Sequence, residues 1–117
     1  EPAMRGWVRE VPGHGANVPL GAVMKASGAG EVLRSRHPGF APGDRVTGMF
    51  GWQQYAAVDP DDQPLPLRRL PADVDAETAL GLLGIPGLTA YFGMLDVGRP
   101  RAGDTVVVSG AAGATGF

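Results

Sequence analysis

The sequence predicts an α/β chain: a β-rich part with many turns, followed by helices and then by one strand of a parallel sheet. Three observations carry this prediction. The chain holds 19 Gly and 11 Pro among 117 residues, more than a helical bundle tolerates, with apolar segments running between them. Helical spacing begins near Leu70. Three consecutive valines, Val106 to Val108, form the short continuous apolar run that is typical of a strand buried on both faces of a parallel sheet.

The first part of the chain alternates between short extended segments and turn signals. Residues 45–50 alternate, with Val46, Gly48 and Phe50 on one face. His-Pro-Gly at residues 37–39 and Pro-Gly-Asp at residues 42–44 are turn signals. We expect a loop over residues 1–18 with at most a short strand at 4–8, and short strands at residues 20–25, 30–34, 45–50 and 52–58. Strands at this spacing predict a small barrel or curled sheet.

Two helices are expected after Leu70. Asp75 suits the N-cap of the first helix, with Glu77 in its first turn, and Gly84 suits the position just past its end. Pro86 suits the first turn of a second helix that ends at Gly98. That helix carries one apolar stripe with i, i+3, i+4, i+7 spacing, which predicts core packing: Leu88, Tyr91, Phe92 and Leu95.

Composition excludes several classes of partner. A net charge of −2 provides no basic face for nucleic acid or anionic lipid, and no apolar run reaches the roughly 20 residues that span a bilayer. Cysteine is absent, which excludes disulfides and thiolate metal sites in this stretch and favours a cytoplasmic protein. We therefore expect no nucleic-acid partner, no membrane association and no metal.

The motif that carries chemistry is the run of small residues after the triple valine. Ala111, Gly113 and Gly116 occupy the positions of an A-x-G-x-x-G pattern, as in the first turn of a dinucleotide-binding βαβ unit. Small residues allow a sharp turn and let a pyrophosphate approach the backbone amides. The expected cofactor-binding residues are Ala112, Gly113, Ala114, Thr115 and Gly116. A purely structural turn, in a chain this rich in Gly and Ala, is the alternative.

Four segments together resemble the medium-chain dehydrogenase/reductase superfamily, most closely its zinc-free alkenal/enone reductases of the leukotriene B4 12-hydroxydehydrogenase and prostaglandin reductase type. The segments are Pro-Ala-Met-Arg-Gly at residues 2–6, Gly-Ala-Gly-Glu-Val at residues 28–32 with Pro-Gly-Asp-Arg-Val at residues 42–46, Gly-Ile-Pro-Gly-Leu-Thr-Ala-Tyr-Phe-Gly at residues 84–93, and the loop at residues 111–116. The resemblance covers the whole chain, and the third segment is specific to this branch.

The resemblance implies a GroES-like β-barrel substrate domain followed by a Rossmann domain. It divides the chain into a barrel portion at residues 1–70, connecting helices at 71–103, and the first strand and loop of the Rossmann domain at 104–117. It also implies that NADPH reduces the carbon–carbon double bond of an enone or alkenal, and that the intact enzyme is a homodimer. The choice between NADP and NAD depends on a residue that the motif places after the loop.

Two departures from the family pattern bear on chemistry. Zinc-dependent relatives carry Gly-His-Glu where this chain has Lys25-Ala26-Ser27, so the position of a histidine ligand is Ala26. The cysteine-rich zinc lobe is missing as well, and we expect no zinc because a catalytic site needs three protein ligands. Ala3 stands where many relatives have Tyr, so no substrate contact is carried over there.

Further candidate residues have a purely structural interpretation beside the functional one. Thr89 matches a position that lies beside the nicotinamide in zinc-free relatives; a helical threonine bonded to its own backbone is the alternative. Arg5 matches a position near the substrate cleft, with a surface ion pair as the alternative. We expect a packing role for Tyr55, an exposed turn for His37 and, for His14, at most a substrate contact from the entry loop. No catalytic residue is assigned.

Three functions remain open on sequence alone. The first is an NADPH-dependent enone/alkenal reductase, the second a zinc-free quinone oxidoreductase that uses the same loop, and the third a non-catalytic binding protein with the same fold. The sequence ends inside the cofactor motif, and we expect the isolated stretch neither to bind NADPH tightly nor to catalyse.

Overall fold

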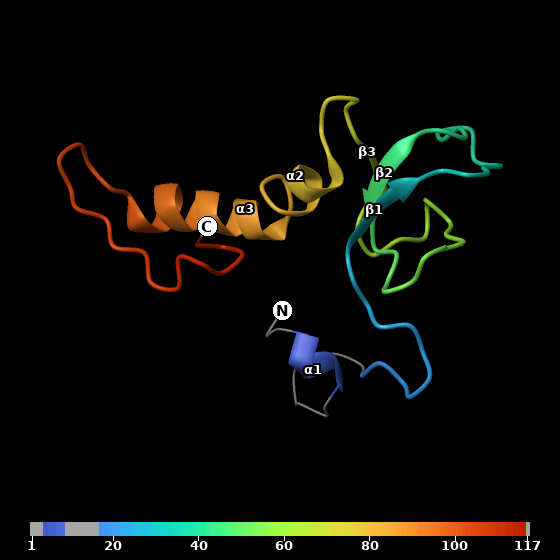
Figure 1. Ribbon diagram of the computed structural model, residues 1–117, viewed down its shortest axis with the longest axis horizontal. Coiled ribbons are helices and arrows are strands. Elements are labelled where there is room, and N and C mark those ends of the chain that lie inside the picture. Colours follow the sequence, from blue (N-terminus) through green and yellow to red (C-terminus); the bar gives the residue numbers. More distant parts are fainter. Residues whose placement is uncertain (1–3, 9–16, 117) are drawn as a thin grey trace.

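A three-stranded antiparallel sheet organises the first half of the chain (Figure 1). In this computed structural model the described residues are 4–8 and 17–116. The strands β1 (Gly28–Glu31), β2 (Arg45–Gly48) and β3 (Arg68–Arg69) lie in that order, so β2 is central. Gly30 pairs with Val46, and Val46 in turn pairs with Arg69. Val46 is only 5% exposed, as expected for an apolar residue in a central strand.

The turn before β2 forms as the sequence predicts. Gly43 has a φ of 89°, a conformation in which glycine is favoured, and the Asp44 amide donates to the Ala41 carbonyl. The Asp44 carboxylate accepts from the Ala41 amide at 2.8 Å and pairs with the Arg69 guanidinium at 2.9 Å. The turn is therefore tied to β3.

The helices follow the sheet. Figure 1 shows α2 (Ala76–Leu80) near the sheet, then α3 (Ile85–Phe92) and the π-helix η2 (Gly93–Gly98) extending away from it. The Asp75 side chain caps α2 by accepting from the Thr78 amide at 2.6 Å, which confirms the predicted N-cap. Pro86 stands at the start of α3, also as predicted.

The first helix ends earlier than predicted. α2 stops at Leu80 with Gly81 as its C-cap, and Gly84 is the N-cap of α3 rather than the residue after α2. The chain reverses in two tight turns, in which the Gly84 and Gly87 amides both donate to the Gly81 carbonyl. Three glycines within seven residues give the chain this freedom, which the helical spacing alone does not reveal.

Several predicted strands are wrong for physical reasons. Residues 5–8 form a single helical turn, α1 (Arg5–Val8), instead of an extended segment. Residues 20–25 and 52–58 form no strand: the Trp52 amide donates to the Met24 carbonyl at 3.0 Å, but no ladder develops from this bond. Residues 105–109 have no strand partner among the described residues. The pairing of Arg68 and Arg69 in β3 was not predicted, since two arginines show no apolar alternation.

The apolar residues of the second half are exposed, contrary to the predicted core packing. Leu88, Tyr91, Phe92 and Leu95 are between 50% and 58% exposed, and Val107 is 88% exposed. In the described part of the chain, the buried apolar residues are Val46 and Ala79. The radius of gyration is 17.2 Å, against about 13 Å for a compact domain of this size.

Candidate functional site

The small-residue loop bends tightly, as the motif requires. Gly110 has a φ of 64°, and the Gly113 amide donates to the Gly110 carbonyl at 2.8 Å. A second turn follows, in which the Gly116 amide donates to the Gly113 carbonyl at 3.1 Å. Two successive turns bring the end of the loop back onto its beginning.

Gly116 has no room for a side chain. A Cβ added at this position would lie 2.7 Å from the Gly110 carbonyl oxygen and 2.9 Å from the Ala111 Cα, both of them backbone atoms that cannot swing aside. At Gly113 the nearest atom would be the same Gly110 oxygen at 3.1 Å. The glycine at the end of the motif is therefore required by close backbone approach.

The two turns leave several backbone amides of the loop without an acceptor among the described residues. The amides of Ala112, Ala114 and Thr115 donate to no other described residue, and all three residues are exposed. In nucleotide sites, unused backbone amides on a tightly bent loop are the donors that bind phosphate oxygens. The Gly113 and Gly116 amides are already used to hold the bend of the loop.

Thr89 lies in α3 with its side chain on the exposed surface. Its hydroxyl donates to the Ile85 carbonyl at 2.7 Å. The structure therefore shows the alternative interpretation of this residue, a helical threonine bonded to its own backbone. The start of α3 is held close to the preceding chain: a Cβ on Gly87 would collide with the Leu82 carbonyl, and one on Gly84 with that of Leu80. Sequence reasoning placed Gly84 just past the end of the first helix and gave Gly87 no conformational role, whereas both glycines allow the close approach of the backbone at this point.

Both predicted cofactor-binding segments lie in the same half of the molecule. Figure 1 shows α3 and the loop-bearing C-terminal segment on the side away from the sheet, with the chain reversing direction after η2. The reversal is fixed by Arg99, whose φ is 47°, and by the turn in which the Asp104 carboxylate accepts from the Arg101 amide at 2.7 Å.

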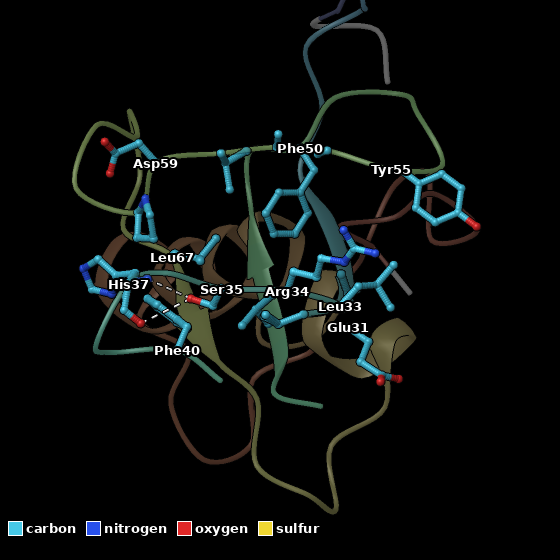
Figure 2. Close-up of a pocket in the computed structure, with 18 of the residues that line it drawn as sticks. Glu31, Leu33, Arg34, Ser35, His37, Phe40, Phe50, Tyr55, Asp59 and Leu67 are labelled. Carbon is cyan, nitrogen blue, oxygen red and sulfur yellow. Dashed lines mark hydrogen bonds between the residues drawn. The ribbon is translucent and has the colours of Figure 1, made fainter. Parts of the chain in front are cut away.

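A wide apolar hollow of about 1410 Å³ lies elsewhere, on the sheet (Figure 2). Phe50 and Leu67 point into it, and none of the predicted cofactor-binding residues lines it. Gln53 and Tyr55 border it, and Tyr55 is 75% exposed, so its predicted packing role is wrong for the described residues. The hollow is an incompletely covered face of the sheet and lacks the enclosed shape of a small-molecule site.

His37 stands at the rim of this hollow. Its side chain is 28% exposed and its Nε2 lies 3.4 Å from an Asp61 carboxylate oxygen, while its Nδ1 accepts from the Gly39 amide at 3.0 Å. The ring is thus engaged in holding the turn, and the prediction of a simply exposed residue is wrong. Arg5 is exposed on α1, and Pro2, Ala3 and His14 lie outside the described residues.

Across residues 4–8 and 17–116, no group of three or more His, Cys, Asp or Glu side chains is placed to hold a metal ion. Ala26, at the position of a zinc-binding histidine in zinc-dependent relatives, accepts a backbone hydrogen bond from Gly51 through its carbonyl. No helix within those same residues has the length and apolar character needed to cross a bilayer.

Comparison with known proteins places these features in a family. Residues 1–64 match the family described as the N-terminal domain of oxidoreductase. The chain is 40% identical to the NADPH-dependent curcumin reductase of Escherichia coli over 116 residues, covering 99% of this chain and 33% of that protein. It is 37% identical to the NADP-dependent 2-alkenal reductase of Nicotiana tabacum over 117 residues, covering 99% of this chain and 34% of that protein.

A solved structure agrees with the sequence comparison. The crystal structure of CurA from Vibrio vulnificus in complex with NADPH superposes with a TM-score of 0.83 at 36% identity, covering 99% of this chain and 34% of that one. The chain spans about a third of the length of the curated relatives it matches. On this evidence the chain belongs to the N-terminal oxidoreductase-domain family, in the zinc-free alkenal/enone reductase branch of the medium-chain dehydrogenases/reductases.

Proposed function

We propose that the protein carrying this chain is an NADPH-dependent reductase of the carbon–carbon double bond of α,β-unsaturated ketones or aldehydes, acting by hydride transfer without zinc. The observation that carries this proposal is the likeness of the whole chain to a solved NADPH complex and to reductases of curcumin and of 2-alkenals. Those substrates share a double bond conjugated to a carbonyl, and we propose the same class of substrate for the protein that carries this chain.

The loop supplies the cofactor site in this proposal. The unused amides of Ala112, Ala114 and Thr115 hold the diphosphate, and Gly113 and Gly116 keep the backbone bent and free of side chains. Thr89 contacts the nicotinamide end. Bound NADPH supplies the hydride, and the protein orients it against the β carbon of the substrate.

The remaining work of the protein is electrostatic. As the β carbon gains a hydride, the carbonyl oxygen of the substrate gains enolate character and requires hydrogen-bond donors. A proton then completes the reduction. We assign neither the donors nor the proton source to a described residue.

The architecture completes the proposal. Residues 1–70 form part of a GroES-like barrel, residues 71–103 connect to the cofactor domain, and residues 104–117 begin a Rossmann sheet in which the triple valine becomes a paired strand. Such a sheet would also cover the exposed stripe of α3 and η2. The intact enzyme is proposed to be a cytoplasmic homodimer.

A spectrophotometric assay tests the proposed function. Purified full-length protein is mixed with NADPH and either an enone, such as a conjugated aryl ketone, or a quinone, and loss of NADPH absorbance is followed. We expect turnover with the enone. Turnover with the quinone alone indicates a quinone oxidoreductase, and turnover with neither under saturating cofactor means that the protein binds without catalysing; either result contradicts the proposal.

A further inference from the structure

The connection between β1 and β2, residues 32–44, contains a histidine whose two ring nitrogens face different partners. The His37 Nδ1 lies 3.0 Å from the Gly39 amide nitrogen, and its Nε2 lies 3.4 Å from an Asp61 carboxylate oxygen. Turning the ring over would place carbon atoms at both points, so these two contacts fix its orientation. Figure 2 shows the ring at the edge of the hollow, next to Phe40.

The Gly39 contact sets the proton state of the ring. A backbone N–H can only donate, so the Nδ1 that receives it carries a lone pair and no proton. The single proton of the neutral ring is then on Nε2, which faces the Asp61 carboxylate. A protonated ring carries N–H on both nitrogens. Nδ1 would then have no lone pair for Gly39, and this hydrogen bond would break.

The Gly39 hydrogen bond belongs to a group of contacts that ties the connection to β3. The Gly39 carbonyl accepts from the Arg69 Nη2 at 2.6 Å, and the Asp44 carboxylate holds the same guanidinium at 2.9 Å. The Ser35 hydroxyl fixes the backbone of His37, because it accepts from the His37 amide at 3.0 Å and donates to the His37 carbonyl at 3.2 Å (Figure 2). With the backbone held, the ring is the part that responds to a proton.

The charged groups around His37 have both signs. Asp61 is 82% exposed, so its attraction for a charged ring is weak. Asp59 already accepts the Asp61 amide at 3.0 Å, and Arg69 of β3 lies over the Phe40 ring at 5.6 Å. Three further charged residues line the same hollow: Glu31, Arg34 and Arg36. A histidine changes charge in the physiological pH range, so the ring can take either state there.

We infer that His37 is a proton-dependent switch in the connection between β1 and β2. The neutral ring accepts the Gly39 amide and closes the turn, whereas the protonated ring releases Gly39 and keeps only its contact with Asp61. Because the Gly39 bond requires the neutral ring, it is present at high pH and is lost as the pH falls through the titration of His37. The connection is therefore looser on the acid side. This inference is independent of the proposed reductase activity.

The inference is tested by NMR on the full-length protein, labelled with 15N in glycine and in the histidine rings. Between about pH 8 and pH 5, the ring nitrogens of His37 and the hydrogen exchange of the Gly39 amide are followed together. At high pH we expect Nδ1 to be the unprotonated nitrogen. As the ring gains its proton, the protection of the Gly39 amide, relative to its unstructured exchange rate at each pH, should fall about fivefold, the effect of one neutral hydrogen bond.

Two variants separate the ring proton from its surroundings. His37→Asn, whose amide oxygen can take the place of Nδ1 and which does not titrate, should keep the Gly39 protection constant over this pH range. Asp61→Asn should retain the loss, because the proton on Nδ1 and not the carboxylate breaks the bond. If His37→Asn does not fold, the wild type still decides, since the ring titration and the loss of protection must share one midpoint.

The inference is overturned if Nδ1 carries the proton at high pH, or if the Gly39 protection in the wild type does not follow the ring titration. It is also overturned if His37→Asn shows the same loss of protection on acidification, or if Asp61→Asn abolishes that loss.

Discussion

The Asp75 carboxylate shows how one side chain sets a helix boundary. It accepts the Thr78 amide at 2.6 Å, and this backbone hydrogen bond is the main cause that holds the pKa of Asp75 below its ordinary value. A carboxylate with a lowered pKa in the folded state stabilises that state above its unfolded pKa. This stabilisation is lost as the pH falls through the folded value.

We therefore expect Asp75→Ala to lower the melting temperature at neutral pH, and to remove part of the acid sensitivity of α2. Asp75→Asn, whose amide oxygen can still cap the helix, should lower the melting temperature less than Asp75→Ala does. Thermal unfolding followed by circular dichroism between neutral and acidic pH checks this. Equal melting temperatures for Asp75→Ala and the wild type at neutral pH would contradict the cap.

Gly87 and Gly93 form a matched pair in the same helical segment. A Cβ on Gly87 would collide with the Leu82 carbonyl, whereas one on Gly93 would meet nothing within 4 Å. Gly87→Ala should lower the free energy of unfolding by about 1–3 kcal/mol, as overpacking does. Gly93→Ala should leave it unchanged or raise it by up to about 1 kcal/mol through helix propensity. Denaturant titration compares the free energies of unfolding of the two variants. Equal losses for Gly87→Ala and Gly93→Ala would contradict the close approach of the backbone at Gly87.

At the scale of elements, β2 provides the clearest packing test. Val46 is 5% exposed between β1 and β3, whereas Val107 is 88% exposed. Val46→Ala should lower the free energy of unfolding by about 2 kcal/mol. Val107→Ala, measured in the 117-residue chain, should change it by less than about 0.5 kcal/mol. A larger effect at Val107 than at Val46 would show that the sheet is not the packed part of this chain.

The sequence predicted those elements whose causes are local. Asp75 as a cap, Pro86 at a helix start and the Pro-Gly-Asp turn at residues 42–44 each depend on neighbours within a few residues, and each is present. Strands depend on distant partners. Residues 52–58 and the triple valine have the right composition but find no ladder within the described chain, while Arg68 and Arg69 pair without any apolar pattern.

The candidate site divides in the same way. The bend at residues 110–116 was predictable because it follows from small residues, and the structure adds that Gly116 is required by the Gly110 carbonyl. The direction of the Thr89 hydroxyl was not predictable, since both readings of that residue use the same sequence. The role of Gly87 was hidden because it acts through a backbone carbonyl outside its own helix.

At the scale of the whole molecule, the exposed apolar surface determines how the isolated chain behaves in solution. Val46 and Ala79 are the buried apolar residues of the described part, while the stripe on α3 and η2 is at least half exposed. We expect the isolated 117-residue chain to bind a hydrophobic dye such as ANS. We also expect it not to bind NADPH tightly. Micromolar NADPH affinity of the isolated chain would be inconsistent with this view.

The central claim is that the loop at residues 110–116 holds the diphosphate of NADPH. Its most direct test is the NADPH dissociation constant of the full-length protein with Gly116→Val, because a side chain there would press on the Gly110 oxygen and the Ala111 Cα and distort the bend. Gly30→Val is the control, since Gly30 lies in β1 with nothing within 4 Å of an added Cβ. We predict at least about a tenfold loss of affinity for Gly116→Val, equivalent to about 1.4 kcal/mol, and none for Gly30→Val. Unchanged affinity in a folded Gly116→Val protein would contradict the claim.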